Sequence, residues 1–408
     1  MKLLFLGPMS LHMKTWCSFF INRHEVLYAT IPDNARATNL KICDDLFAET
    51  PPRYLTKKGI DNPSSFQGRV RIAARIVDGT RNLVGANTIQ TSYMKTVPDT
   101  ASSPLRLAFQ FAYLDRVRKL VREENPDVIE GHYLFPYGVL AAFSRHQKIV
   151  ACTWGSDLMV DCVHYSYYRM LAKKVFEKVY FVHGPSAALK AYSLKLGCPE
   201  DKFFVVPWGA DLDLFKPQNS GNEIRTEYGI ADDVPVIISC RALEPLYRIN
   251  EIVEGFAIVK KKLPKARLMI LNDGSEKTKL LSLCKNLGIS GSVHFAGRIP
   301  HERLPFFLAA SDLYVQMPTS DGLPVSLQEA MASGLPVVTS NVGGNSEAVC
   351  GNGFFATDHL ELAEKVLLIL RKNMAKDLGK ISRHIAEEKY NRRDNMTKME
   401  TLYGRSGL

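Results

Sequence analysis

The chain has 408 residues, and its 46% hydrophobic and 23% charged content is typical of a soluble globular protein with two or three domains. Average glycine and proline contents exclude collagen-like and low-complexity classes, and a chain this long needs no disulfide or metal to stabilise its core. The net charge of +10 attracts anions such as nucleotides, phospholipid surfaces or nucleic acid, but it does not choose among them.

The eight cysteines are scattered and form no Cys-x-x-Cys pair, which excludes the usual zinc and thioredoxin-type motifs. Scattered cysteines in a large chain predict reduced core residues and a cytoplasmic protein. The apolar start Leu3–Leu6 is too short for the core of a signal peptide. No run of about 18 apolar residues occurs, so we expect no membrane-spanning segment.

The first residues predict a βαβ unit. An apolar strand at Lys2–Leu6 is broken by Gly7-Pro8, a helical pattern continues to Phe20, and Glu25–Ala29 is apolar again. This order of elements favours a parallel sheet with a right-handed crossover.

Alternation of helices and strands resumes near residue 104. A long amphipathic helix is predicted at Leu105–Glu124 and a second helix at Tyr137–Arg145. Several predicted strands end in a glycine-containing loop: Asp127–Glu130, Lys148–Thr153, Lys178–Val182 and Phe203–Val206. Ligands collect at the carboxyl ends of such strands. Residues 41–103 have weak periodicity, and we interpret them as an irregular insertion.

The second half repeats the same organisation after a mixed, polar segment at residues 212–234 that resembles a linker. Helices are predicted at Ile249–Lys262 and Glu276–Leu287. The predicted strands are Val236–Cys240, Arg267–Leu271, Val293–Ala296, Leu313–Gln316 and Pro336–Ser340. The fold class is therefore α/β, with two parallel-sheet domains in tandem.

The most informative segment extends from Asp321 to Val338. Pro324 is a good first-turn residue for a helix over Val325–Ser333, whose free N-terminal N–H groups could bind a phosphate. Glu329 in that helix could accept hydrogen bonds from vicinal hydroxyls, and Asp321 precedes it by eight positions. These features suit a nucleotide sugar. The alternative is an ordinary βα loop in which the two acids are a helix cap and part of a solvated face.

The whole segment resembles the acidic-x₇-Glu motif of the retaining glycosyltransferases of family 4, which have the GT-B fold. The first acidic position is usually Glu in that family and is Asp321 here. Five further elements resemble the family in order along the chain: Gly131-His132, Trp154–Asp157, Pro207–Asp211 with Phe215, Arg241–Arg248, and Gly343–Glu347. The resemblance covers most of the chain except residues 41–103.

This resemblance implies two Rossmann-like domains with parallel sheets that face a central cleft. Residues 1–211 would bind the acceptor, and residues 212–387 would bind the nucleotide sugar. Residues 388–408 resemble the terminal helix that crosses back to the N-terminal domain.

The resemblance also implies catalytic roles for four residues. Arg241 and Arg248 would hold the diphosphate and stabilise the charge that develops on it, because guanidinium groups match phosphate oxygens well. His132 and Asp321 would contact the transferred sugar. The alternatives are two surface arginines and a structural histidine. Donor-binding residues are implied at Gly7, Gly274, Arg298, Ile299, Gly322, Leu323, Val325, Ser326 and Glu329; Gly7 could equally be a simple turn residue.

On the acceptor side the resemblance implies Ser10, His12, Trp154 and Asp157, and helix capping is the alternative role for Asp157. The string Asp211-Leu212-Asp213 could suggest a metal, but it lies in the interdomain element and no ligand cluster accompanies it. We therefore expect no metal and no cofactor other than a nucleoside-diphosphate sugar as co-substrate.

The predicted function is metal-independent transfer of a hexosyl-type sugar, with retention, to a hydroxyl of a sugar or lipid-linked acceptor in polysaccharide or glycolipid synthesis. Nucleic acid is not an expected partner. The alternatives are a nucleotide-sugar-binding subunit without transferase activity and a GT-B sugar-nucleotide epimerase.

Basic residues are concentrated between Phe66 and Arg122, where ten basic and three acidic residues give a local net charge of +7. Within Phe66–Val77, three arginines alternate with aliphatic residues: Arg69, Arg71 and Arg75. This amphipathic pattern favours peripheral contact with an anionic membrane or a lipid-diphosphate acceptor. The alternative is a solvated basic face around an acceptor groove.

Overall fold

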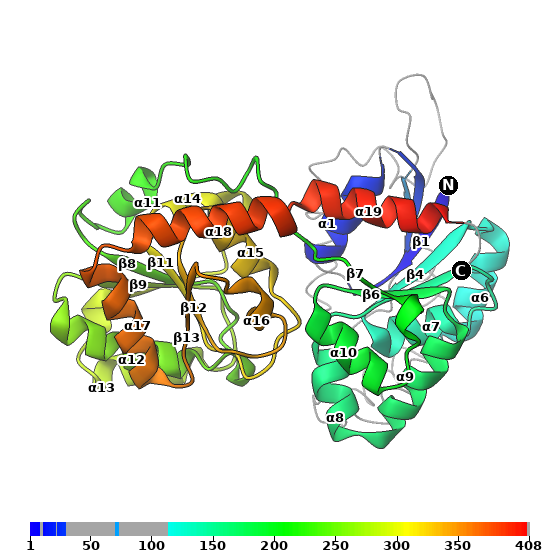
Figure 1. Cartoon of the computed structure of the whole chain (residues 1–408), viewed down its shortest axis with the longest axis horizontal. Coiled ribbons are helices and arrows are strands. Elements are labelled where there is room, and N and C mark those ends of the chain that lie inside the picture. The colour runs from blue at the N-terminus through cyan, green and yellow to red at the C-terminus, as the bar shows by residue number, and fades with distance from the viewer. Residues whose placement is uncertain (9–10, 22, 30–69, 73–112, 406–408) are drawn as a thin grey trace, which may run out of the picture. The chain divides into compact units, whose positions relative to one another are not determined.

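The computed structural model describes residues 1–8, 11–21, 23–29, 70–72 and 113–405. The chain divides into two compact units (Figure 1). Unit 1 comprises Met1–Gly184, Lys190–Phe204 and Arg405–Leu408, and unit 2 comprises Pro185–Leu189 and Val205–Gly404.

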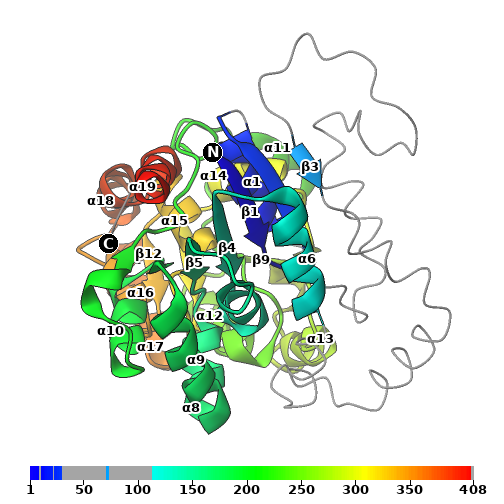
Figure 2. The ribbon, with the colours of Figure 1, turned by 90° about the vertical axis from the view of Figure 1, so that its right-hand side faces the viewer.

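Unit 1 is built on a sheet with the strand order β3-β2-β1-β4-β5-β6-β7. Its strands are β1 (Lys2–Leu6), β2 (Glu25–Ala29), β3 (Val70–Ile72), β4 (Val128–His132), β5 (Ile149–Cys152), β6 (Phe181–Gly184) and β7 (Phe203–Val205). β1 pairs in parallel with both β2 and β4, and Figure 2 shows β1, β4 and β5 in this sheet. The chain moves outward in one direction from β1 and then in the other from β4, so the topological switch point lies between these two strands.

The helices of unit 1 surround this sheet. They are α1 (Leu11–Ile21), α6 (Leu114–Glu124), η2 (Leu134–Gly138), α7 (Val139–Ala142), η3 (Asp157–Asp161), α8 (Cys162–His164), α9 (Ser166–Lys178) and α10 (Ala187–Lys195), which continues from unit 2. Trp16 and Phe20 of α1 are buried, and the Phe20 ring lies 5.8 Å from that of Phe5 on β1. Burial of such side chains contributes about 1.5–3 kcal/mol each relative to exposure.

Unit 2 has the strand order β10-β9-β8-β11-β12-β13, with its switch point between β8 and β11. The strands are β8 (Val236–Ser239), β9 (Arg267–Leu271), β10 (Val293–Gly297), β11 (Leu313–Gln316), β12 (Val337–Thr339) and β13 (Gly353–Phe355). The helices are α11 (Asn222–Glu227), α12 (Ile249–Lys262), α13 (Lys277–Asn286), α14 (Leu304–Ala309), α15 (Val325–Ala332), α16 (Asn345–Ala348), α17 (His359–Arg371), α18 (Ala375–Lys389) and α19 (Arg392–Gly404).

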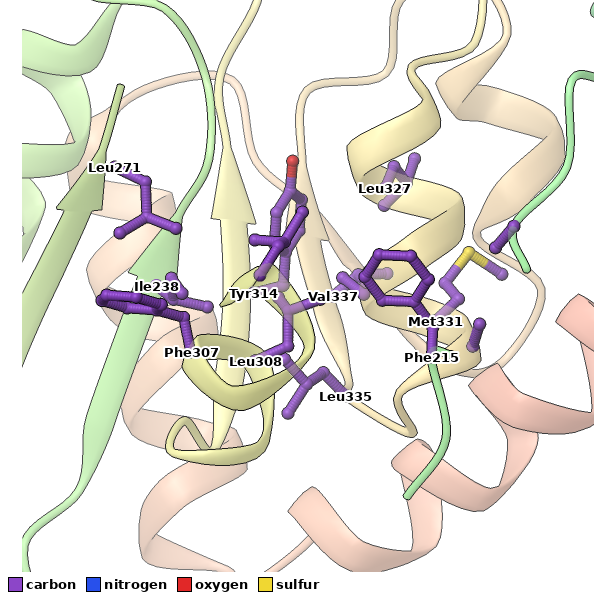
Figure 3. Packing of buried hydrophobic residues seen from close by; sticks show 14 of the residues in the cluster. Phe215, Ile238, Leu271, Phe307, Leu308, Tyr314, Leu327, Met331, Leu335 and Val337 are labelled. Carbon is purple, nitrogen blue, oxygen red and sulfur yellow. The ribbon is translucent and has the colours of Figure 1, made fainter. Parts of the chain in front are cut away.

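The core of unit 2 lies on both faces of its sheet. Tyr314 packs with Phe307 and Leu327 on one face (Figure 3), whereas the next residue along β11, Val315, belongs to the cluster on the other face. Successive strand residues point to opposite faces, so a strand covered by helices on both sides is apolar throughout.

The parallel α/β architecture predicted from the sequence is confirmed. Helix Ile249–Lys262 and strands Arg267–Leu271 and Leu313–Gln316 have the predicted bounds. The strand predicted at Lys178–Val182 begins later, at Phe181, because α9 continues to Lys178.

Two other interpretations were partly wrong. The supposed linker at 212–234 contains α11, whose Ile224 is buried. The supposed irregular insertion contributes β3, which pairs in parallel with β2. Three residues are too few to show a clear hydrophobic period, so β3 could not be predicted from the sequence. Most of the insertion lies outside the described residues.

Candidate active site

Asp321 and Arg241 come together at the switch point of unit 2. Arg241 follows β8, and Asp321 lies in the loop between β11 and α15. The Asp321 Oδ2 atom lies 2.6 Å from Nη2 of Arg241, and each side chain is only 11% exposed. Two residues that the sequence predicted to be catalytic therefore form one ion pair.

Three further side chains surround this ion pair. Arg241 Nη1 donates to Ser326 Oγ at 3.3 Å, and the hydroxyls of Ser326 and Tyr314 lie 3.0 Å apart. The Arg241 guanidinium carbon lies 4.2 Å from the centre of the Tyr247 ring, a cation–π contact. Ser326 was predicted, whereas both tyrosines were missed, although Tyr247 lies inside the predicted Arg241–Arg248 loop.

Two features of this group are relevant to anion binding. Burial alone would lower the pKa of Arg241, but the Asp321 carboxylate and nearby tyrosines raise it above its usual value, so the guanidinium stays charged. Ser326 belongs to the first turn of α15, where backbone N–H groups have no partner within the helix. A buried cation and a helix N-terminus together are suited to bind a phosphate and to stabilise charge on it.

Arg248 has different surroundings. Its Nε donates to the carbonyl of Met317 at 2.8 Å, and its Nη1 donates to that of Thr357 at 3.3 Å. Its backbone is left-handed, with φ of 45°, immediately before α12. None of the described contacts joins Arg248 to Arg241 or Asp321. The two arginines therefore lie in different surroundings, and the catalytic roles of both Arg241 and Arg248 stay predictions.

Glu329 lies on a buried face of α15, not on a solvated one. Its Oε1 atom is 2.7 Å from Nε2 of His301 and 3.8 Å from Nη2 of Arg392. The His301 ring in turn lies 5.3 Å from that of Phe215. Sequence reasoning missed His301 and Arg392, which lie outside every motif that it used.

Close packing of the chain requires glycine at two positions of the motif loops, Gly344 and the predicted donor residue Gly274. A Cβ atom at Gly344 would overlap the carbonyl of Gly322, and Gly344 N–H donates to the Asp321 carbonyl at 3.2 Å. A Cβ atom at Gly274 would overlap the carbonyl of Leu243, in the Arg241 loop. The motif loops of unit 2 therefore pack directly on one another.

The remaining predicted donor residues of unit 2 lie near this packed region. Leu323 and Ile299 both pack in the core on the α15 side of the sheet, and Val325 begins α15. Arg298 follows β10, whose strand ends at Gly297. Their contact with a donor stays a prediction.

In unit 1, Gly7 and His132 lie on the two sides of the switch point between β1 and β4. A Cβ atom at Gly7 would come within 2.9 Å of Met13 Sδ and 3.2 Å of His132 Cβ. A side chain at position 7 would therefore crowd Met13 and His132, so contacts within the protein itself favour glycine there. Ser10 and the side chain of His12 lie outside the described residues.

His132 is fully buried rather than open at a strand end. Its Nε2 atom lies 3.2 Å from Oε1 of Glu130, and the Trp16 ring meets it edge-on at 4.9 Å. Burial lowers the pKa of His132 to about 4, an effect that Glu130 opposes and His183 reinforces. The imidazole is therefore neutral near neutral pH.

Asp157 caps the loop that contains Trp154. Its carboxylate accepts backbone N–H groups from four residues at 2.8–3.2 Å: Leu134, Trp154, Gly155 and Leu158. Burial raises the pKa of Asp157, and these hydrogen bonds oppose the rise. The contacts favour the capping alternative for Asp157, and a direct acceptor contact stays a prediction. The half-buried Trp154 ring meets the His132 ring edge-on at 6.3 Å.

The Asp211-Leu212-Asp213 string forms a turn in the structure. Asp211 Oδ1 accepts the N–H groups of Asp213 and Leu214, each at 3.1 Å. Asp211 is therefore used as a local cap, as is common for aspartate in turns.

Two other groups in the described part of the chain have ligand atoms within 4.8 Å of one another: Glu130 with Cys152 and His183, and Glu251 with Glu254 and His359. In each group a carboxylate is hydrogen-bonded to an imidazole, at 2.5 Å for Glu130–His183 and 3.1 Å for Glu251–His359. All cysteines in the described ranges are free. No helix among the described residues is long and apolar enough to cross a membrane.

Comparison with known families gives one match for each half of the chain. The sequence model of "Glycosyl transferases group 1" matches residues 220–388, and that of "Glycosyl transferase 4-like domain" matches residues 83–209. The chain is 24% identical over 305 residues to N-acetyl-alpha-D-glucosaminyl L-malate synthase of Bacillus anthracis. The aligned residues make up 72% of this chain and 79% of that protein. It is also 26% identical over 246 residues to alpha-monoglucosyldiacylglycerol synthase of Streptococcus pneumoniae. These aligned residues make up 56% of this chain and 55% of that protein.

Solved structures agree on the fold. The Anabaena protein Alr3699/HepE in complex with UDP-glucose has a TM-score of 0.71 at 18% identity, with 99% of this chain and 100% of that chain covered. Its complex with UDP gives a TM-score of 0.72 at 19% identity, with the same coverage. The predicted GT-B fold is confirmed by this likeness and by the two parallel sheets.

Proposed function

Because the chain belongs to the group 1 glycosyltransferases, we propose that it transfers a hexosyl-type sugar from a nucleoside-diphosphate sugar to an acceptor hydroxyl, with retention of configuration and without a metal. Unit 2 binds the donor, and unit 1 supplies residues for the acceptor. The observation that supports this proposal most strongly is the largely buried Arg241, which pairs with Asp321 and donates to Ser326 in the first turn of α15.

The role of Arg241 follows from the charge that the reaction creates. When the bond between the anomeric carbon and the phosphate oxygen breaks, the leaving nucleoside diphosphate gains negative charge. A guanidinium that is already buried and oriented stabilises that charge without reorganisation, which is worth about 10²–10³ in turnover for a single donor group. The Arg241 Nε atom is enclosed and has no hydrogen-bond partner among the described residues.

The proposed chemistry is attack from the face that the phosphate leaves. The acceptor oxygen forms the new bond to the anomeric carbon, the phosphate oxygen departs with the electron pair, and that oxygen takes the acceptor's proton. Asp321 is engaged by Arg241 and is assigned an orienting role rather than that of a covalent nucleophile. The configuration is retained because the new bond forms on the side of the old one.

The proposed acceptor is a sugar or a lipid-linked sugar in glycolipid or polysaccharide synthesis. The names of the relatives support this class, since one is a monoglucosyldiacylglycerol synthase. We extend the proposal to peripheral contact with an anionic membrane through Arg69, Arg71 and Arg75. Of these three, only the backbone of Arg71, in β3, belongs to the described residues. Binding to acidic vesicles should fall with ionic strength and with substitution of all three by glutamine.

Product analysis tests the proposed function directly. The purified chain is incubated with UDP-, GDP- and ADP-sugars and candidate acceptors, with and without excess chelator, and the product is examined by NMR. We expect a glycoside with the anomeric configuration of the donor and equal rates in chelator. An inverted product contradicts retention, and recovery only with manganese or magnesium contradicts metal independence. A changed donor sugar without transfer indicates an epimerase, and binding without turnover indicates a non-catalytic subunit.

A further inference from the structure

A network of buried hydrogen bonds connects Arg241 with the end of β12 through the core of unit 2. Its central members are Tyr314 and Gln316 of β11, which point to the same face of the sheet because they are two residues apart. The Tyr314 ring lies in the apolar core on the α15 side (Figure 3), and both side chains are fully buried. Enclosed polar groups need hydrogen-bond partners, so the partners of these two show what the network does.

The first half of the network begins at Arg241. Its Nη1 atom donates to Ser326 Oγ at 3.3 Å. The Tyr314 hydroxyl lies 3.0 Å from Ser326 Oγ and 3.2 Å from Gln316 Oε1. The distance between the two hydroxyls does not tell which of them gives its proton to the other, so the direction must come from the groups beyond them.

The second half ends at a backbone carbonyl, which can only accept. Asn345 Nδ2 donates to the Ser340 carbonyl at 3.3 Å, so Asn345 Oδ1 is left to accept from Gln316 Nε2, at 3.1 Å. Thr339 Oγ1 accepts from both amide nitrogens, each at 3.1 Å. An amide donates only through its nitrogen, so the Gln316 atom that faces Tyr314 is an accepting oxygen.

These two ends determine the direction of the bonds between them. A guanidinium group only donates, so Ser326 Oγ accepts from Arg241. Gln316 Oε1 only accepts, so the single hydroxyl proton of Tyr314 goes to it. Tyr314 therefore has only lone pairs for Ser326, and the hydroxyl proton of Ser326 points at Tyr314. That proton is not available to a phosphate at the N-terminus of α15.

We propose that Tyr314, oriented by Gln316, is a positioning residue for Arg241. It holds the Ser326 hydroxyl as an acceptor, and this acceptor fixes the Arg241 guanidinium beside the first turn of α15. The Ser326 hydroxyl itself makes no hydrogen bond to the phosphate. The inference rests on the proposed function, in which Arg241 binds the diphosphate of a nucleotide sugar.

Binding of a nucleoside diphosphate measures this role without turnover. A double-mutant cycle compares the effect of Tyr314→Phe in the wild-type chain and in the Arg241→Met chain, with UDP, GDP and ADP as probes in titration calorimetry. In the wild-type chain we expect Tyr314→Phe to weaken binding of the preferred diphosphate about threefold to tenfold, as for one lost hydrogen bond. In the Arg241→Met chain we expect a loss of less than about twofold, because no guanidinium is left to orient.

Two further variants separate positioning from stability. Ser326→Ala interrupts the network at its next member, so its loss of affinity should also disappear in the Arg241→Met chain, and it replaces Tyr314→Phe if that variant does not fold. Ser311→Ala removes another buried hydroxyl of unit 2, which donates to the Phe307 carbonyl at 2.9 Å just before β11. It should leave the diphosphate affinity unchanged even if the melting temperature falls.

Three results would overturn the inference. The first is unchanged diphosphate affinity in the folded Tyr314 and Ser326 variants. The second is an equal loss with and without Arg241, which for Ser326→Ala would mean that the hydroxyl binds the phosphate directly. The third is a similar loss in Ser311→Ala. If the wild type binds none of the three diphosphates, the proposed function is contradicted and the inference falls with it, whereas binding that fails the cycle contradicts the inference alone.

Discussion

Asp321 and Arg241, eighty positions apart in the sequence, neutralise each other across 2.6 Å at the switch point of unit 2. They meet because β8 and β11 are neighbours in the sheet, and each residue follows the end of its strand. A donor diphosphate must therefore bind an arginine that already has one carboxylate partner. This relationship determines what each substitution at the site should do.

Asp321→Asn should destabilise the protein by about 3–5 kcal/mol, because it leaves a largely buried guanidinium without its anion. A nucleoside diphosphate then supplies the missing charge, so it should raise the melting temperature more in this variant than in the wild type. Urea unfolding and thermal shift measure the two effects. Asp213→Asn, at an exposed position in the same unit, is the matched control and should change neither.

Arg241→Met should lower turnover about 10²–10³-fold, as expected for loss of a donor group that stabilises transition-state charge. Arg248→Met should affect turnover less and stability more, because the Arg248 side chain holds two backbone carbonyls. Steady-state kinetics and denaturation of both variants provide the comparison. Equal losses of turnover would mean that Arg248 also contacts the diphosphate.

Glu329→Ala should weaken nucleotide binding by about 1.5–3 kcal/mol, the usual loss for a hydrogen bond to a charged group. His301→Gln should cause a smaller loss, because it removes only the partner that orients Glu329. Titration calorimetry measures both affinities. Glu302→Ala, an exposed carboxylate beside His301, is the control, and a similar loss there would point to a general charge effect.

The free energy of unfolding should decrease as the pH falls, because the buried His132 resists protonation in the folded state. Its pKa is about 4 in the folded chain and about 6.5 when unfolded, so between these values only the unfolded state binds the proton. The free energy of unfolding therefore loses up to about 3 kcal/mol from this group as the pH falls from 6.5 to 4. His132→Asn should flatten the pH dependence in that window, as measured by urea unfolding at several pH values. An unchanged slope would contradict the lowered pKa.

The fold could be predicted from the sequence because strand and helix periods alternate clearly in both halves. Arg241 and Asp321 could be predicted as site residues because each follows the end of a strand, but the ion pair between them was not predicted. Helix α9 was missed even though Tyr168, Ala172, Val175 and Phe176 are buried at helical spacing, so its signal was present. The sequence therefore contained the pattern that predicts this helix, and the pattern was overlooked.

Other features of the site could not be predicted, since they depend on contacts across the chain. Glu130 and His183 are separated by 53 positions, and their hydrogen bond forms because β5 places β4 and β6 in register. Arg248 has a left-handed backbone and donates to the carbonyls of Met317 and Thr357, features that residue type does not reveal. Asp157 and Asp211 form local caps, which a motif comparison cannot separate from ligand contacts.

Arg241 and Glu329 are the residues through which we propose that unit 2 binds a nucleoside-diphosphate sugar. A thermal-shift and calorimetric screen of the full chain with UDP, GDP, ADP and their sugars tests it most directly. We predict that one nucleoside class stabilises the protein, by about 2.7 kcal/mol at a hundred times its dissociation constant, and that Arg241→Met and Glu329→Ala each weaken this effect. Absence of binding by every nucleotide, or binding that both variants retain at full strength, would contradict the account.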